Sequence, residues 1–146
     1  MNTLPIQVQA ADANFGDEGM VTDDMVVYRI LEAARRVHTT LGPGFLESIY
    51  TRALAGELID SGFRVDRERI IKVWYGVRIV GKHRLDLLID DSVIIELKAN
   101  RGIIPVHVAQ MNSYLQATTF PFGLILNFGS TDLEWQFIQA AKSNHN

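Results

Sequence analysis

The chain has 146 residues, of which 47% are hydrophobic and 21% charged, and this suits one globular domain with a sizeable core. It contains no cysteine, which excludes disulfides, thiolate zinc sites and a cysteine nucleophile and is typical of the reducing cytoplasm. The formal net charge of −3 excludes a chain that is basic throughout, but residues 64–84 hold seven Lys or Arg against two Asp or Glu. This basic segment indicates either contacts with phosphates or a solvated hairpin with charged edges.

Residues 1–21 are polar and acidic, and we expect them to form a flexible tail, as we do for residues 141–146. The first 28 residues contain no Lys or Arg, which argues against a secretory or transit peptide. No apolar run approaches the ~18–20 residues that cross a bilayer, so no membrane partner is expected. We therefore predict a single cytoplasmic domain over residues 22–140.

Apolar side chains recur at helical spacing over residues 26–41, behind the N-cap candidates Thr22 and Asp23. A Gly-Pro-Gly run at 42–44 ends this helix and begins a turn. A second helix is expected over about residues 46–60. Because the connection is short, the two helices should form a hairpin.

Beyond residue 62 the pattern changes to one that favours strands. The predicted elements are strands at 63–67, 69–75 and 78–80, a turn at Gly81-Lys82, a strand pair at 83–89 and 93–99, a helix at 105–117, and strands at 122–128 and 133–139. The last strand is expected at the outer edge, and Trp74 is expected to pack, with stacking on a base as its alternative role. This order predicts an α/β fold in which a mixed central β-sheet is flanked by helices.

Charged side chains interrupt the most apolar strand pair of the sequence. Asp86, Glu96 and Lys98 lie inside strands whose other residues are mainly Leu, Ile and Val. Charges in buried sheet are costly unless they hold a metal or one another. Because side chains alternate across a strand, we expect Arg84 to share a face with Asp86, and Glu96 to share one with Lys98. A structural ion-pair network of these four residues is the alternative to a metal site.

The length of the hairpin loop decides whether the two acids meet. A three-residue loop over 90–92 would pair Ile89 with Val93 and set Asp86 directly opposite Glu96. Opposed side chains have Cβ atoms about 4.5–5.5 Å apart, close enough for two carboxylates to chelate one hard cation. A two-residue turn would put the acids on opposite faces. The hypothesis of a metal site therefore requires the longer loop.

A magnesium ion held by Asp86 and Glu96 would explain why two acids face each other here. It prefers oxygen ligands, keeps several waters, polarises phosphoryl oxygens and lowers the pKa of bound water, and manganese can substitute for it. In the expected register Arg84 lies opposite Lys98. The Lys98 ammonium could orient the attacking water or stabilise the charge that develops on the phosphorane.

The acid, acid and lysine pattern resembles the PD-(D/E)xK nuclease signature, with Asp86, nine residues, and then Glu96-Leu97-Lys98. The run Gly44-Phe45-Leu46-Glu47-Ser48-Ile49-Tyr50 matches the G-x-x-E-x-x-Y motif of the GxxExxY protein family. Three further landmarks resemble that family: Leu41-Gly42-Pro43, Gln110 followed by Tyr114-Leu115, and Asn127-Phe128-Gly129. The resemblance covers residues 23–138.

The resemblance implies a restriction-endonuclease-like, PD-(D/E)xK core and a role for each motif residue. Glu47 would join the site from the second helix, Asp86 and Glu96 would bind the metal, and Lys98 would be the catalytic lysine. Gln110, on the following helix, would lie near the site as a further catalytic residue. We expect the carbonyl of Leu97 to assist these metal ligands.

Three more residues are expected to contact substrate or support the site: Arg84, Tyr50 and His107. Tyr50 lies three residues after Glu47 on one helix face, and could bond to it or simply pack. His107 precedes Gln110 by three residues on one helical face. By strand alternation His83 should point away from Asp86, so we expect a structural role for it.

These inferences predict a magnesium-dependent nuclease that hydrolyses phosphodiester bonds of DNA or RNA, with the basic segment guiding the backbone. The alternative is a catalytically weak module of the same fold that binds nucleic acid or protein. A third reading is a scaffold with an incidental acidic pair. A homodimer would suit duplex cleavage, and both a homodimer and a protein partner are open possibilities.

Overall fold

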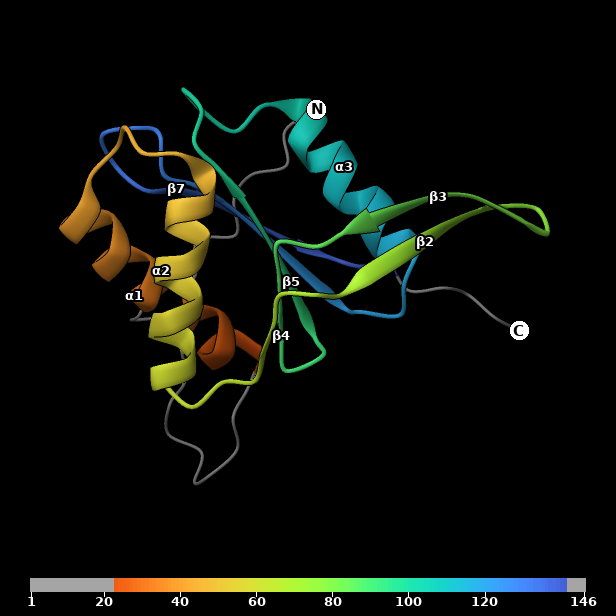
Figure 1. The fold of residues 1–146 in the computed structure, drawn as a ribbon, viewed down its shortest axis with the longest axis horizontal. Helices are drawn as coiled ribbons and strands as arrows, with labels where there is room; N and C mark the ends of the chain where they lie inside the picture. Colours follow the sequence, from red (N-terminus) through yellow and green to blue (C-terminus); the bar gives the residue numbers. More distant parts are fainter. Residues whose placement is uncertain (1–22, 142–146) are drawn as a thin grey trace.

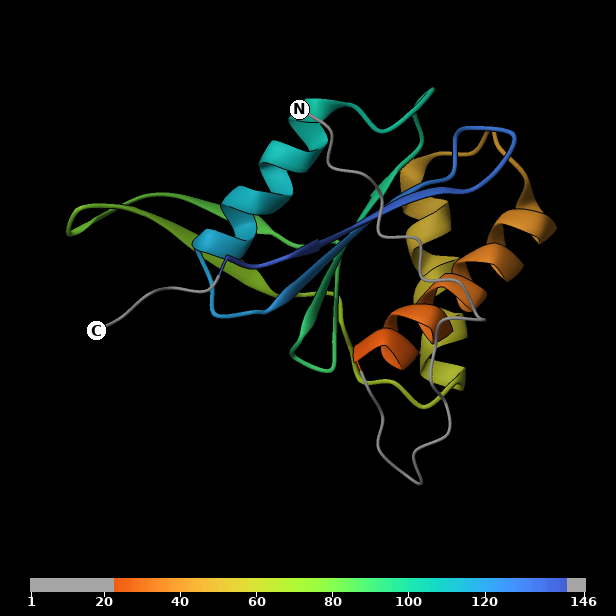
Figure 2. The same cartoon turned by 180° about the vertical axis from the view of Figure 1, so that it is seen from behind.

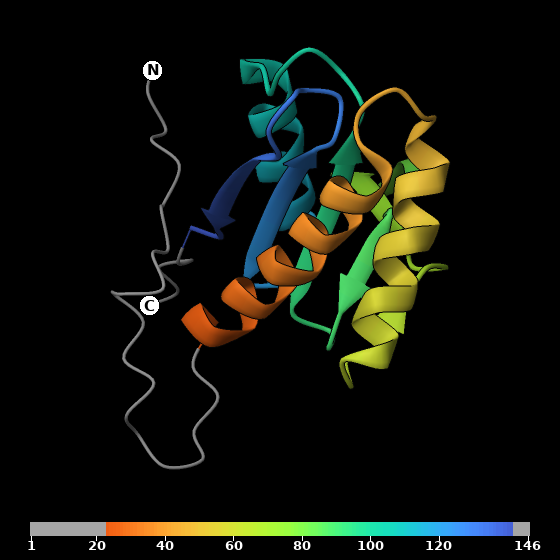
Figure 3. The same cartoon turned by 90° about the vertical axis from the view of Figure 1, so that its left-hand side faces the viewer.

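The computed structural model describes residues 23–141, so the predicted tails, 1–21 and 141–146, lie outside the described part except for residue 141. The elements in chain order are α1 (Asp23–Leu41), α2 (Glu47–Asp60), β1 (Val65–Asp66), β2 (Ile70–Tyr75), β3 (Arg78–Arg84), β4 (Leu87–Ile89), β5 (Val93–Lys98), α3 (Pro105–Gln116), β6 (Phe122–Asn127) and β7 (Glu134–Gln139). They form a mixed α/β fold, with α1 and α2 on one side of a sheet and α3 on the other (Figure 1; Figure 3). The predicted fold class is confirmed. Within this part of the chain, no helix combines the length and apolar character that crossing a bilayer requires.

The central sheet has five strands in the order β1-β4-β5-β6-β7, with β7 at one edge as predicted. β5 and β6 pair in parallel and the other neighbours are antiparallel. The connection between the two parallel strands contains α3, since parallel neighbours need a crossover. Both central strands are buried on two faces, which is why their sequences are nearly continuous runs of Ile, Leu and Val.

Alternating side chains of the sheet contribute to two separate cores. Leu87, Ile95 and Leu97 face the core that α1 and α2 cover. Leu88 and Ile94 face the second core, which α3 covers. Glu96 and Lys98 alternate with Leu97, so they belong to the α3 side of the sheet.

The helical hairpin also forms as predicted, and its turn sets the start of α2. Gly42 has φ 67° and Gly44 has φ 117°, a region that favours glycine. The amide of Gly42 donates to the carbonyl of His38 at 2.8 Å, which closes the end of α1. The chain then turns so that α2 begins at Glu47.

A separate two-stranded sheet, β2 with β3, extends away from the body of the molecule (Figure 1; Figure 2). The predicted turn at Gly81-Lys82 is wrong, because β3 runs through it and Gly81 pairs with Val73. A bulge between Val73 and Trp74 absorbs one residue of β3, so the strands continue together instead of turning. We call this hairpin, residues 70–84, the arm.

The predicted strand 83–89 is broken where the arm joins the sheet. The amide of Leu85 donates to the carbonyl of Arg69 at 2.9 Å, and only from Leu87 does the chain pair with β5. Leu85 packs in the α3-side core, whereas strand alternation had placed it with Leu87. The bend at residues 85–86 ends the alternation, so predictions that extended it through this point were wrong.

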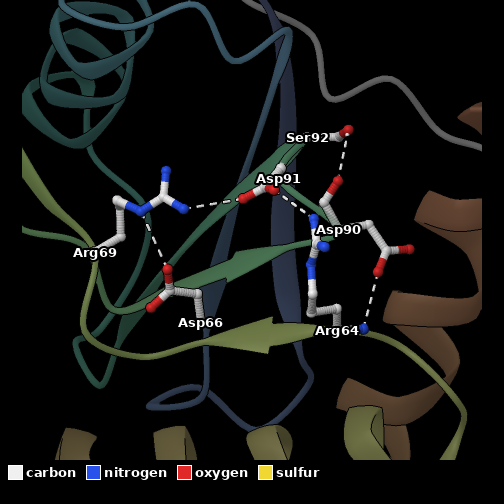
Figure 4. Close-up of polar contacts among 6 residues, drawn as sticks. All are labelled: Arg64, Asp66, Arg69, Asp90, Asp91 and Ser92. Atoms are coloured by element: carbon white, nitrogen blue, oxygen red, sulfur yellow. Dashed lines mark hydrogen bonds and ion pairs between the residues drawn. The ribbon is translucent and has the colours of Figure 1, made fainter.

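The loop between β4 and β5 is held by charged partners (Figure 4). Asp90 and Asp91 both have φ 50°, which aspartate tolerates better than most residues. Asp90 accepts a hydrogen bond from the amide of Arg64 at 2.8 Å, and Asp91 pairs with the guanidinium groups of Arg64 and Arg69. Arg69 also contacts Asp66 at 3.1 Å. Two cations of the basic segment are thus neutralised by neighbouring acids, so they stabilise this loop.

Candidate active site

The three-residue loop places the two acids as the metal hypothesis requires. Ile89 pairs with Val93, and Leu87 pairs with Ile95. The same register, extended by one residue, sets Asp86 opposite Glu96. The amide of Leu97 donates to Asp86 Oδ2 at 2.9 Å, and the amide of Asp86 lies 3.4 Å from Glu96 Oε1. Each carboxylate is thus tied to the backbone of the opposite segment. The predicted register is confirmed.

The environment of Glu96 opposes its ionisation. Its side chain is buried, with 5% of its surface exposed. Burial, followed by the negative charge of Asp86, raises the pKa of Glu96 from 4.5 to about 9, against a smaller opposite effect of Lys98. A protein gains nothing in stability from forcing two carboxylates together, so this arrangement indicates a site that serves chemistry.

Lys98 is positioned by the helix that covers this face of the sheet. Its Nζ donates to Gln110 Oε1 at 3.2 Å, from β5 to α3. Pro105 begins α3, so the first turns of the helix carry His107 and Gln110 toward the carboxyl end of β5. Gln110 thus lies near the site, as the resemblance implies, and its partner there is Lys98.

Glu47 approaches the site as the first residue of α2. Its pKa is raised, first by burial and then by the charge of Asp86, while Lys98 and a hydrogen bond from the Ala99 backbone act in the opposite direction. Glu47 therefore lies within electrostatic range of the pair. Across residues 23–141, however, no three His, Asp or Glu side chains are grouped closely enough to hold an ion together. A direct ligand role for Glu47 stays a prediction.

The donor set fits a hard cation that keeps most of its waters. Asp86 and Glu96 supply two carboxylates, and Mg²⁺ is usually bound through one or two of them. A cation between them would relieve their repulsion. In addition, His83 Nε2 is buried without a hydrogen-bond partner among the described residues, 3.8 Å from Glu96 Oε1. An unpaired polar atom beside the acids leaves a hydrogen-bonding position open to a further polar group at this site.

Tyr50 packs in the core, which is one of the two roles predicted for it, and its buried side chain is not placed to reach a substrate. The side chain is fully buried and stacks on Phe128 with ring centroids 4.8 Å apart. Its hydroxyl donates to the carbonyl of Gly42 at 2.5 Å and accepts from the amide of Phe45 at 3.1 Å. Tyr50 therefore fixes the turn from which α2 begins, and it acts on Glu47 only by positioning that turn.

Arg84 is not opposite Lys98, because it pairs with Ile70 in the arm. It nevertheless lines a cavity of about 380 Å³ that reaches the site. The lining residues are Glu47, Ser48, Thr51, Arg52, Arg67, Arg84, Leu85 and Asp86. Arg84 lies 3.8 Å from Glu68, whereas Arg52 and Arg67 form no ion pair with any residue in the described range. Three guanidinium groups around an opening beside two acids suit a phosphate backbone.

His107 has a local structural contact. Its Nδ1 accepts a hydrogen bond from the amide of Ile104 at 3.1 Å, at the start of α3. Burial and then the charge of Lys98 lower its pKa. The lowered pKa favours the neutral imidazole, and His107 lies close enough to Lys98 for the charge of that ammonium to contribute. A contact with substrate stays a prediction.

The expectation that His83 points away from the acids is wrong, because its Nε2 lies 3.8 Å from Glu96 Oε1, and Tyr114, named from the sequence only as a family landmark, also lies at the site. His83 stacks on Tyr114 with ring centroids 4.4 Å apart, and burial lowers its pKa. The pKa of Tyr114 is raised by burial and then by the charges of Glu96 and Asp86. Both rings therefore flank the carboxylates. The bend after the arm brings His83 to the site, and no sequence pattern marked that bend.

The Asn127-Phe128-Gly129 landmark holds the loop that follows Lys98. Asn127 is fully buried, accepts from the amide of Asn100 at 2.9 Å and donates to the carbonyl of Asn100 at 3.0 Å. A side chain on Gly129 would bring its Cβ within 2.2 Å of that same carbonyl oxygen. The loop thus passes too close to position 129 for any residue other than glycine. Asn127 and Gly129 together keep the loop after β5 in place.

An acid directly before one strand, and an acid and a lysine on the adjacent strand of a mixed α/β sheet, form the arrangement of the PD-(D/E)xK class. The sequence profile of the PD-(D/E)XK nuclease superfamily matches residues 24–138, and the chain belongs to this superfamily. The narrower GxxExxY assignment stays a prediction.

Two solved structures are similar to this chain at low identity. An alkaline exonuclease (LHK-Exo) from Laribacter hongkongensis gives a TM-score of 0.47 and 15% identity, over 84% of this chain and 72% of that chain. LHK-Exo in complex with dAMP gives a TM-score of 0.49 and 15% identity, over 82% of this chain and 71% of that chain. Among curated proteins, no sequence matches.

Proposed function

We propose that this protein is a magnesium-dependent nuclease that hydrolyses phosphodiester bonds of DNA or RNA. The observation that carries the proposal is the buried Asp86–Glu96 pair, with Lys98 held beside it by Gln110. Superfamily membership agrees with it.

In this proposal each residue has a defined task. Asp86, Glu96 and the Leu97 carbonyl would hold magnesium, with Glu47 joining directly or through a bound water. The ion would polarise the phosphoryl oxygen and lower the pKa of a bound water. Lys98, whose Nζ is oriented by Gln110, stabilises the negative charge that develops on the phosphate oxygens. The arginine-lined cavity beside Asp86 receives the neighbouring backbone.

The test is turnover of labelled single- and double-stranded DNA and RNA, with Mg²⁺, with Mn²⁺ and with EDTA. We expect cleavage only with metal, and its loss in Glu96→Gln and Lys98→Ala. Asp132→Asn, an exposed acid after β6, and Arg35→Ala, an exposed cation on α1, are the matched controls. Metal-dependent turnover that survives both site substitutions would exclude this assignment.

The second candidate is a module of the same fold that binds nucleic acid or a protein and does little chemistry. The net charge of −3 and the small size of the chain motivate this reading. Salt-dependent binding of nucleic acid without cleavage under any metal condition would support this reading. Homodimerisation is a prediction that sedimentation of the purified protein can check, and a protein partner stays a prediction.

A further inference from the structure

The arm has an unusual surface for a part of a protein exposed to solvent. Among the described residues, thirteen large apolar side chains are exposed, and seven of them lie in the arm. These seven are Ile70, Val73, Trp74, Tyr75, Val77, Ile79 and Val80. Trp74 is 57% exposed and Tyr75 is 80% exposed. Concentrated exposed apolar and aromatic area on one projecting element marks an interaction surface.

The charge of the arm identifies the kind of partner. Between Glu68 and Asp86 the chain has no acid, while the arm carries four cations, Lys72, Arg78, Lys82 and Arg84. Lys72 and Lys82 are directly opposed across the two strands, and neither pairs with a described acid. Like charges in this position are destabilising. An anionic partner would relieve the repulsion, whereas a second copy of the arm would add to it.

Aromatic and basic groups occur together on the arm. Lys72 and Trp74 are two residues apart on β2, so they share a face of the strand. Both line a hollow of about 280 Å³ between the arm and the end of α3, together with Thr118, Thr119 and Phe120. Alternating cations and exposed aromatics bind unpaired bases, since the cations contact phosphates and the rings stack.

The arm also leads to the acid pair. β3 ends at Arg84, two residues before Asp86, and His83 near that end lies 3.8 Å from Glu96. Figure 1 shows the base of the arm next to β4 and β5. A nucleic-acid strand bound along the arm would therefore lead to the acid pair. We propose that the arm binds single-stranded nucleic acid and guides it into the site. This inference rests on the proposed function for its purpose, but the binding itself requires no cleavage.

The experiment measures binding separately from cleavage. Labelled oligothymidylate and oligouridylate are titrated with the full chain in EDTA, followed by anisotropy and by tryptophan fluorescence. Trp74 and Trp135 are the two tryptophans of the chain, so Trp74→Phe identifies the source of any quenching. We expect quenching that disappears in Trp74→Phe, and affinity that falls about fivefold to 100-fold in Trp74→Ala but is largely kept in Trp74→Phe.

The cations are tested in the same assay. Lys72→Ala combined with Lys82→Ala should weaken binding and reduce its salt dependence, while the control Arg35→Ala should not. Equal affinity of wild type and all arm variants would overturn the inference, and so would equal or tighter binding of a blunt duplex. A change in sedimentation without any change in oligonucleotide binding would identify a second copy as the occupant, which also overturns it.

Glu96→Gln keeps this result independent of the proposed function. Suppose that Glu96→Gln and the wild type bind oligothymidylate equally, and that neither protein cleaves it with metal. The nuclease proposal then fails, while the arm inference stands. If the wild type cleaves single strands and the arm variants bind and cleave them equally well, the arm inference fails alone. Circular dichroism of every variant confirms that the fold is kept.

Discussion

Replacing Glu96 with glutamine should stabilise the metal-free protein near neutral pH. Glutamine has the shape of a protonated glutamate but no proton to lose. In the wild type, burial beside Asp86 raises the pKa of Glu96 above its ordinary value of 4.5, so the folded state holds this proton more tightly than the unfolded state does. The wild type therefore loses stability as the pH rises above 4.5, and the substitution removes this loss.

The sign and size follow from linkage. For an acid whose folded pKa is raised, stability is complete below 4.5 and declines as pH rises toward about 9, where the folded pKa lies. Each pH unit in that window lowers the free energy of unfolding by about 1.4 kcal/mol. Between pH 4.5 and 7 the wild type therefore loses up to about 3 kcal/mol, and Glu96→Gln should avoid this loss.

Urea unfolding at several pH values, in EDTA and with Mg²⁺, measures this effect. The free energy of unfolding of Glu96→Gln minus that of wild type should be near zero at pH 4.5 and should increase toward pH 7 and beyond. Magnesium should stabilise the wild type, more so at higher pH since binding releases the Glu96 proton, and should have little effect on the variant.

Asp132→Asn serves as the control, because that acid is exposed. A difference between Glu96→Gln and wild type that does not change with pH would refute the reasoning. It would show that the two carboxylates are not held together in the metal-free protein. A magnesium effect of equal size in both proteins would exclude Glu96 as a ligand.

Three further outcomes are expected. Tyr50→Phe should lower the free energy of unfolding by about 1–2 kcal/mol in urea, because the hydroxyl of a buried tyrosine loses two partly buried hydrogen bonds. Gly129→Ala should destabilise by about 1–3 kcal/mol, since its Cβ would meet the Asn100 carbonyl, and unchanged thermal unfolding would contradict this close approach. Gln110→Ala should lower turnover roughly 10-fold to 100-fold with little change in stability, because Lys98 loses the acceptor that orients it, and normal kcat would assign Gln110 no such role.

Local rules predicted the elements of this fold because local forces dominate them. The Gly-Pro-Gly turn separates α1 from α2, Pro105 begins α3, and apolar runs mark the central strands. The loop of residues 90–92 has the length that pairs Ile89 with Val93, and this short-range constraint places Asp86 opposite Glu96. The acid pair could thus be found from the sequence, since strand pairing depends on a few neighbouring residues.

The predictions made from side-chain alternation failed where long-range contacts determine the path of the chain. Leu85 bonds to Arg69 and packs under α3, so the chain bends and His83 comes to the site. The same limit applies to Tyr50, which the motif presents as a site residue and the core buries completely. Neither result follows from spacing, because each depends on packing between distant segments.

The amino-acid sequence by itself therefore determined the order of elements, the register of the acid-bearing hairpin and the kinds of group at its centre, since these depend on neighbours within a few residues. The tertiary structure decided which charges are free. It pairs Arg64 and Arg69 with acids, and leaves Arg52 and Arg67 without described partners at the opening beside Asp86. The physical reason is that electrostatic pairing depends on distance in space, which only the packing of helices and strands establishes.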